Sequence, residues 1–223
     1  MLDNFYKALQ GERWTWYFEG LGMTLLISLG AIALGCILGV IVSLIKYTYK
    51  KYNKLKIASK LCDIYLAVFR GTPVYVQLLI MYLIVLVSTP DIWVAILTFG
   101  INSGAYVAEI IRGGLESVDD GQLEAGNSLG LSKIQVLFHI VLPQAVRRAL
   151  PPFCNEFIAL IKETSIVGTI GVVDLTKVAA SITARTYEPF APYLIIALMY
   201  LAVVLILTWL LKLLERRLAK SDR

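Results

Sequence analysis

The chain has 223 residues, of which 58% are hydrophobic and only 17% are charged, and its formal net charge is +5. Soluble globular proteins carry roughly 25% charged residues, so this composition argues against a soluble domain and predicts an integral membrane protein. The basic residues gather between long apolar runs, as in the cytoplasmic loops of membrane proteins, so no nucleic-acid partner is expected. No repeat or linker divides the sequence, and we expect residues 1–223 to form one transmembrane domain.

The N-terminal segment, residues 1–18, predicts a short amphipathic helix at the membrane interface. It opens with MLDNFYKALQ and ends in an aromatic group, Trp14, Trp16, Tyr17 and Phe18, that suits the level of the lipid headgroups. A frayed terminus is the alternative. A cleavable signal is not expected, because a basic n-region is lacking and the apolar run that follows is too long.

Five apolar runs follow, each roughly long enough to cross a hydrocarbon core of about 30 Å. Residues 70–73 interrupt the second run, because Pro73 cannot continue the hydrogen-bond ladder of a helix. In the fourth run, Pro151 and Pro152 are expected to start the helix, and residues 174–192 are interpreted as the connection to the fifth. The predicted spans are residues 21–45, 64–87, 92–111, 152–172 and 193–214.

The basic residues also predict the orientation in the membrane. Six lysines and no acid lie between residues 46 and 60, and Lys133, Arg147 and Arg148 lie in the third connection. Basic residues gather again after residue 211, whereas connections 88–91 and 174–192 hold only Lys177 and Arg185. Since cytoplasmic loops are enriched in Lys and Arg, the N-terminus is predicted outside, and the C-terminus and third connection in the cytoplasm.

Polar residues within the spans are costly and therefore mark candidate sites. Asn102, Tyr106 and Glu109 share one stripe of the third span, and two neighbouring stripes of the fourth carry further polar residues. If these helices pack together, the stripes line a common polar surface. The candidate substrate contacts are Asn102, Tyr106, Asn155, Glu156 and Glu163.

Structural roles are the alternatives for these residues. Asn102 and Tyr106 are able to hydrogen-bond across helices, and Glu109 suits an interfacial role with Arg112. Lys162 and Glu163 are able to pair within the bundle or across a dimer.

The segment 124–143, EAGNSLGLSKIQVLFHIVLP, lies between two spans and carries its own helix signals. Glu124 and Ala125 suit the start of a short helix, and Gly130 suits its end because glycine tolerates a left-handed backbone. The spacing from Glu124 through Gly130 to Leu142-Pro143 resembles the "EAA" signature of permease subunits of ATP-binding cassette (ABC) importers. Gly126 replaces the second alanine of that signature, which weakens helix propensity slightly.

The resemblance extends over nearly the whole chain, to the polar amino acid branch of that family. It is carried also by Phe69-Arg70-Gly71-Thr72-Pro73, by residues 108–114 (AEIIRGG) and by residues 160–165 (LIKETS).

The resemblance implies an all-α integral membrane protein with five transmembrane helices and a type I ABC importer-like permease fold. It implies a second permease subunit, a pair of cytoplasmic ATPase subunits that carry Mg-ATP, and an external binding protein that delivers an amino acid. The residues expected to couple the chain to the ATPase are Glu124, Ala125, Gly126, Gly130 and Leu131.

The chain itself is not expected to be an enzyme. It lacks the G-x-x-x-x-G-K-[ST] nucleotide loop, and its three cysteines and one histidine have no metal-like spacing, so no cofactor or metal is expected. Glu156 and Glu163 outnumber Lys162 in the candidate lining, which favours a basic amino acid as the substrate. A passive channel, and a membrane scaffold that recruits a cytoplasmic partner, are the alternative functions.

Overall fold

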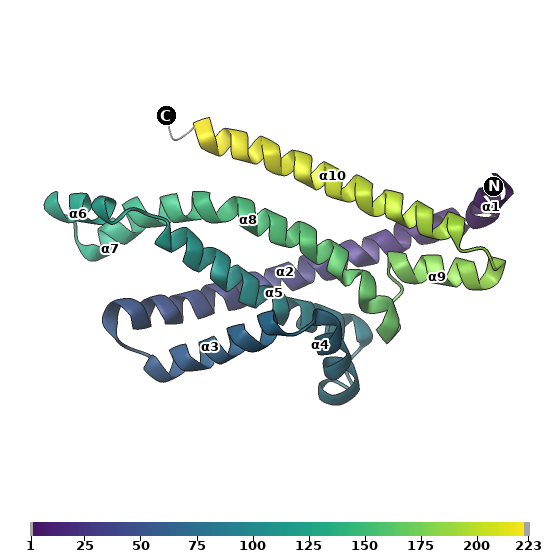
Figure 1. Ribbon diagram of the computed structural model, residues 1–223, viewed down its shortest axis with the longest axis horizontal. Helices are drawn as coiled ribbons and strands as arrows, with labels where there is room; N and C mark the ends of the chain where they lie inside the picture. Colours follow the sequence, from purple (N-terminus) through teal and green to yellow (C-terminus); the bar gives the residue numbers. More distant parts are fainter. Residues whose placement is uncertain (1, 221–223) are drawn as a thin grey trace.

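The computed structural model describes residues 2–220, and within this range every regular element is a helix (Figure 1). The all-α prediction is therefore confirmed. Ten α-helices are interrupted by two π-helical segments and one 3-10 segment. They are α1 (Leu2–Leu9), α2 (Arg13–Tyr52), α3 (Lys56–Gly71), α4 (Val74–Ile80), η1 (Met81–Val85), α5 (Asp91–Glu116), α6 (Asp120–Ser128), α7 (Lys133–Val136), η2 (Leu137–Val141), α8 (Leu142–Glu163), η3 (Thr164–Ile170), α9 (Leu175–Thr186) and α10 (Phe190–Lys220).

Length and hydropathy identify the elements that can cross a membrane. Within the described range, α2, α5 and α10 are each long and apolar enough to do so alone. Two bent pairs, α3 with α4–η1 and α7–η3 with α9, bring the possible crossings to five. This agrees with the five predicted spans.

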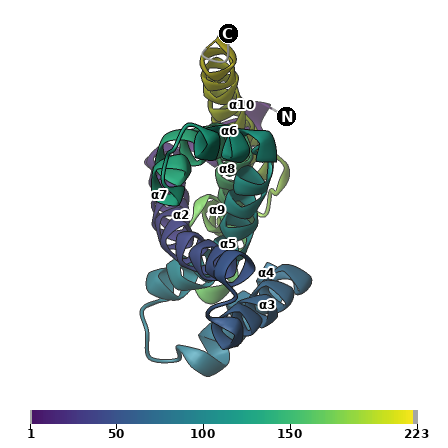
Figure 2. The same cartoon turned by 90° about the vertical axis from the view of Figure 1, so that its left-hand side faces the viewer.

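Glycines allow α2 and α5 to lie against each other at the centre of the bundle. A Cβ on Gly39 would lie 2.6 Å from Cγ1 of Val107, and one on Gly100 would lie 2.6 Å from Cδ2 of Leu34. Buried Phe99 and Ile27 fill the same interface. The α10 helix and the α3–α4 pair lie at opposite edges of the molecule, with α2, α5 and α8 between them (Figures 1 and 2).

The predicted second span is broken more sharply than the sequence indicates. The axes of α3 and α4–η1 differ by 107°. Thr72 is extended, with φ −123° and ψ 149°, because the residue before a proline is disfavoured in the helical region. The run therefore does not form one straight helix, and its first helix begins at Lys56 rather than near residue 64.

The predicted start of the fourth span is wrong. Pro151 and Pro152 lie inside α8, which begins at Leu142 with Pro143 in its first turn. Each internal proline removes one backbone hydrogen bond, but close packing on α5 holds the helix: a Cβ on Gly114 would lie 2.7 Å from the carbonyl oxygen of Ala145. The connection 174–192 likewise contains a helix, α9, that was not predicted.

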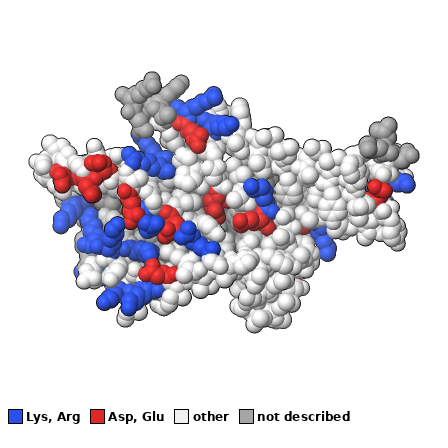
Figure 3. Space-filling model, viewed as in Figure 1, with Lys and Arg blue, Asp and Glu red and all other residues white. Residues whose placement is uncertain are grey.

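The two ends of the molecule differ in charge. The α6 and α7 helices lie at the same end as the α2–α3 connection and the C-terminal end of α10, while α1 and α9 lie at the other (Figure 1). Lys and Arg side chains gather at the α6–α7 end of the visible face (Figure 3). A short N-terminal helix, α1, is present as predicted, and its Phe5 makes an edge-to-face contact with Phe190 of α10, with ring centroids 6.4 Å apart. Its placement at the membrane interface stays a prediction.

Candidate functional site

Asn102 lies at the break between α3 and α4. Its Nδ2 donates to the carbonyl oxygen of Phe69 at 2.9 Å and to Oε1 of Gln77 at 2.9 Å. Gln77 Nε2 donates in turn to the carbonyl oxygen and to the hydroxyl of Thr72, at 3.1 and 2.8 Å. The last carbonyls of a helix have no partners within the helix, so these two buried amides satisfy the broken end of α3.

Sequence reasoning missed Gln77. The available signal was an amide four residues after Pro73 within an otherwise apolar run. A buried side-chain amide needs partners, and the carbonyls released by Pro73 are suitable ones.

Tyr106 and Glu109 belong to a row of contacts along α5 that Arg70 joins from α3. The guanidinium carbon of Arg70 lies 5.5 Å from the centroid of the Tyr106 ring, and Nη1 of Arg70 lies 3.5 Å from Oε2 of Glu109. Arg112 pairs with the same Glu109 oxygen at 2.6 Å and with Glu116 at 2.5 Å. Glu109 and Arg112 thus pair with each other, which was not predicted from the sequence. Exposed ion pairs add little stability, and of these three the Arg70–Glu109 pair is the one that crosses from α3 to α5.

Glu156 is the candidate that links α8 to α5. Its Oε1 accepts a hydrogen bond of 2.8 Å from Ser103, which is fully buried beside Asn102. Asn155 and Glu163 are exposed on the same helix. Among residues 2–220, neither Lys162 nor Glu163 has an ion-pair partner within 4 Å, so the pairing considered for them is not formed within the bundle.

The five candidate contacts are therefore divided between two faces of α5. Asn102 and Tyr106 bond toward α3 and α4, whereas Glu156 meets α5 from the side of α8. Asn155 and Glu163 remain exposed in the single chain. Of the five, Glu156 links the third and fourth predicted spans, but through Ser103, which is not a residue of the predicted stripe.

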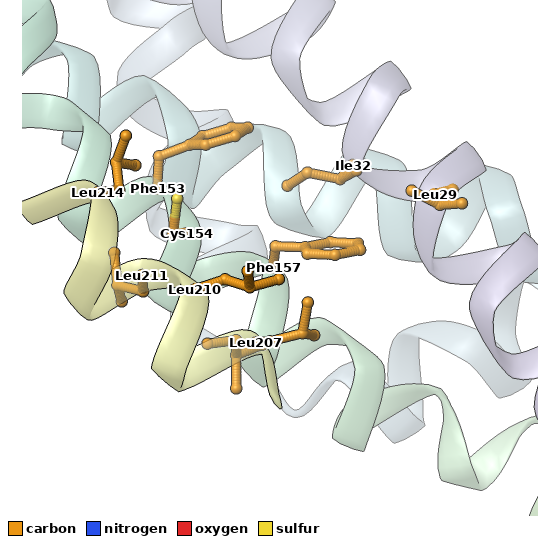
Figure 4. A pocket seen from close by; sticks show the side chains of 10 residues that line it. Leu29, Ile32, Phe153, Cys154, Phe157, Leu207, Leu210, Leu211 and Leu214 are labelled. Atoms are coloured by element: carbon orange, nitrogen blue, oxygen red, sulfur yellow. The ribbon is translucent and has the colours of Figure 1, made fainter. Parts of the chain in front are cut away.

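A separate cavity of about 310 Å³ lies between α2, α8 and α10 (Figure 4). Its lining is apolar throughout, so it does not suit a zwitterionic amino acid. Figure 4 shows leucines of α10 facing two phenylalanines of α8, with Leu29 and Ile32 of α2 on the far side.

The segment 124–143 includes most of α6 and all of α7, two short helices at one end of the molecule (Figure 1). We call α6, α7 and the residues that join them the exposed turn. The α6 helix begins at Asp120, four residues earlier than expected, and Asp119 accepts a hydrogen bond of 2.7 Å from the Gly121 amide. Gly130 has φ +78°, the left-handed conformation predicted for it. Ser132 and Gln135 form a capping box that starts α7.

Gly126 is buried where α6 folds back onto the following helix. A Cβ there would lie 2.8 Å from Cδ1 of Ile140 and 2.9 Å from Cγ2 of Val136. The glycine that departs from the signature thus permits a close contact between α6 and α7–η2.

The other side of this segment exposes apolar side chains. Leu129 is 80% exposed and Ile134 is 69% exposed, while Glu124 and Ala125 are exposed beside them. The helix does not stop at Leu142-Pro143 as expected: α7, η2, α8 and η3 follow one another without a break from Lys133 to Ile170. The exposed turn is thus joined directly to the helix that packs on α5.

No group of three or more His, Cys, Asp or Glu side chains within residues 2–220 is arranged to bind a metal ion.

Comparisons with known proteins give consistent results. A family described as "Binding-protein-dependent transport system inner membrane component" matches residues 31–220. The chain is 38% identical over 209 residues to an arginine transport system permease protein of Bacillus subtilis, covering 92% of this chain and 93% of that protein. It is 37% identical over 205 residues to the glutamine transport system permease protein of Escherichia coli K12, covering 90% of this chain and 91% of that protein.

Solved structures of ABC transporters are also similar to this chain. A crystal structure of an amino acid ABC transporter with histidines superposes with a TM-score of 0.83 at 38% identity, covering 91% of this chain and 94% of that one. An inward-facing methionine ABC transporter superposes with a TM-score of 0.76 at 17% identity, covering 94% and 99%, which indicates a common fold.

Proposed function

The chain belongs to the family of binding-protein-dependent transport system inner membrane components, and from this membership we propose that it is the permease subunit of an ATP-driven importer of polar amino acids. As a permease of an ABC transporter it is not the catalytic subunit. ATP hydrolysis falls to separate cytoplasmic ATPase subunits that bind Mg-ATP, and the chain needs no cofactor of its own. A second permease subunit and an external binding protein complete the assembly.

The observation that carries this proposal is the exposed turn formed by α6 and α7. Leu129 and Ile134 leave large apolar surfaces open on a short, well-capped structure. Such surfaces on an otherwise charged end of a protein mark a contact site for another protein. Glu124, Ala125, Gly126, Gly130 and Leu131 shape this turn, and we assign them to the coupling with the ATPase.

Motion at the turn has a direct route into the bundle. From Lys133 to Ile170 the chain is helical, and its α8 portion packs on α5. When the ATPase subunits close, a rigid-body shift of α6 and α7 would tilt α8 relative to α5. This suits alternating access, in which one bundle rocks against another around a central pathway.

The charge distribution supports an orientation with α6 and α7 in the cytoplasm. The lysine-rich α2–α3 connection and the basic end of α10 lie at the same end (Figures 1 and 3). Cytoplasmic loops carry the excess of Lys and Arg. The N-terminus is then outside and the C-terminus inside.

For the substrate we propose a polar amino acid, with a preference for a basic one. The similarity to an arginine permease and to a glutamine permease supports this class. Glu156 and Glu163 supply carboxylates on α8, and Lys162 forms no ion pair with them among the described residues. Tyr106 and Asn155 complete the set of proposed substrate contacts, and Asn102 acts indirectly, by holding the α3–α4 break.

Reconstitution in liposomes tests the proposal. The chain is purified with the subunits that co-purify with it, and uptake of labelled arginine and glutamine is measured with the external binding protein present. ATP-dependent accumulation against a gradient is expected. Downhill flux without ATP would instead identify a passive channel, and recruitment of a cytoplasmic protein without any flux would identify a scaffold.

A further inference from the structure

A pocket of about 280 Å³, lined by charged as well as apolar surface, lies where α2, α3 and α5 meet, at the end of the molecule that carries the α2–α3 connection. Its lining includes three cations, Lys46, Lys50 and Arg112, and two carboxylates, Asp63 and Glu116. We call this the basic pocket.

The two lysines of the basic pocket keep hydrogen-bond donors to spare, whereas Arg112 is paired with Glu109 and Glu116. Lys50 Nζ lies 2.8 Å from Glu116 and its side chain is 72% exposed, while Lys46 pairs with Asp63. A lysine ammonium has three donors, of which each of these pairs uses one. Further lysines follow at once in the connection, without an acid between residues 46 and 60. The pocket therefore favours an anionic group.

An apolar groove of about 290 Å³ adjoins the basic pocket and shares Ser43, Tyr47 and Leu115 with it. It lies between α2, α5 and the η2–α8 helix, and it continues into a smaller apolar pocket that shares Val40 and Val146 with it. From Tyr47 to Cys36 the groove follows α2 for roughly 16 Å at 1.5 Å per residue. One leaflet of a 30 Å hydrocarbon core is about 15 Å deep.

The basic pocket suits the charged headgroup of a lipid. The adjoining apolar groove, about as long as one leaflet is deep, suits an acyl chain. We propose that an anionic phospholipid binds here, with its phosphate in the basic pocket and one acyl chain along the groove between α2 and α8. Basic pockets between transmembrane helices on the cytoplasmic side suit anionic headgroups. A soluble phosphate would leave the groove empty, so the occupant is a lipid of the leaflet next to the α2–α3 connection.

A lipid bound here would contact the helix that leads to the exposed turn. Leu137 and Phe138 of η2 line the groove, directly after α7. The acyl chain therefore packs between the central α2–α5 pair and the helix that leads to the exposed turn. The site is independent of the amino acid transported.

Binding is tested on the full chain, purified with its co-purifying subunits in detergent and titrated with phosphatidylglycerol in native mass spectrometry. Lys50→Gln is expected to weaken binding about five-fold, since each basic residue near an anionic surface contributes about 1 kcal/mol. The matched control, Lys212→Gln at an exposed position of α10, is expected to bind as the unaltered chain does. Equal affinities for phosphatidylglycerol and phosphatidylcholine would overturn the charged half of the proposal.

A second variant tests the groove. Val146 is 52% exposed and lines it, so Val146→Trp is expected to fill the groove and reduce the number of retained phosphatidylglycerol molecules. Leu205→Trp, at a 58% exposed position on α10, is the control and is expected to have no effect. Retention unchanged in Val146→Trp, or binding of glycerol 3-phosphate as tight as that of the lipid, would overturn the proposal.

Discussion

Asn102 on α5 donates a hydrogen bond of 2.9 Å to Gln77 on α4, and both side chains also bond to the broken end of α3. Two amides that lie 25 residues apart in sequence thus hold the 107° bend between α3 and α4 in place. The bend begins with Pro73, but a proline alone fixes no angle between the two helices. The angle between α3 and α4 is held by the side chains of Asn102 and Gln77, which bond to the carbonyls that the break leaves free.

Asn102→Ala and Gln77→Ala are each expected to destabilise the chain by about 1–2 kcal/mol, the range for hydrogen bonds between membrane helices plus an unpaired partner. The double variant should lose less than the sum, because each amide needs the other. Unfolding in a denaturing detergent measures the effect. Gln144→Ala removes an amide that bonds only within its own helix, to Ile140, and is the control. Fully additive losses would contradict the coupling.

Gly39 is expected to tolerate no side chain. In Gly39→Ala the new methyl would lie 2.6 Å from Cγ1 of Val107 and 3.0 Å from the backbone nitrogen of Ala108, so α2 must move away from α5. Overpacking of this kind costs about 1–3 kcal/mol. Gly22→Ala, with no atom within 4 Å of the new methyl, should instead be neutral or stabilising, since alanine favours helix. Thermal unfolding of both variants in detergent compares them.

Gly130 is expected to be required for coupling rather than for insertion. Its φ of +78° suits glycine or asparagine but not a β-branched residue. Gly130→Val should change the conformation of the exposed turn and uncouple ATP hydrolysis from amino acid uptake. Gly130→Asn should retain coupling. The ratio of phosphate released to amino acid accumulated in liposomes measures this. Tight coupling in the valine variant would remove the turn from the coupling path.

Glu163→Gln is expected to reduce arginine uptake more than glutamine uptake, because it removes a carboxylate that suits a cationic substrate. Competition between the two amino acids in the reconstituted transporter measures the preference. Glu215→Gln, at an exposed position of α10, should leave the preference unchanged. If Glu163→Gln retains both substrates equally, Glu163 takes no part in recognition.

Cysteine labelling tests the orientation. In a chain whose three cysteines, Cys36, Cys62 and Cys154, are replaced by alanine, a cysteine at Ser132 should react only after the membrane is permeabilised. A cysteine at Tyr187, which is 90% exposed after α9, should react in intact cells. The opposite pattern would place the exposed turn outside, beyond the reach of a cytoplasmic ATPase.

Much of the fold could be predicted because apolar length and charge are local properties of the sequence. The three long apolar helices and the two bent pairs fall on the five predicted runs, and Pro73 marked the break in the second run. The start of α8 could not, because Pro151 and Pro152 look like a helix start until the packing of Gly114 on Ala145 is known. The α9 helix was missed because its residues are neither apolar enough nor long enough to be recognised as a span.

The site was harder to predict. Helical spacing shows which residues share one face of a helix, but it does not show which other helix packs against that face. Asn102 shares a stripe with Tyr106, yet it bonds toward α4 because the freed carbonyls of α3 lie there. Glu156 was placed correctly beside α5, though its partner is Ser103 and not a residue of the predicted stripe. Gly126 was counted as a departure from a motif, whereas it is the point at which α6 meets Val136 and Ile140.

The unbroken run from Lys133 to Ile170 sets a scale for the movement that the turn can produce. At 1.5 Å per residue the run is roughly 55 Å long, so tilting it as one body by about 5° about one end would move the other end by about 5 Å. If the exposed turn is cytoplasmic, as proposed, a small tilt there would move residues near the opposite side of the bilayer by several ångström.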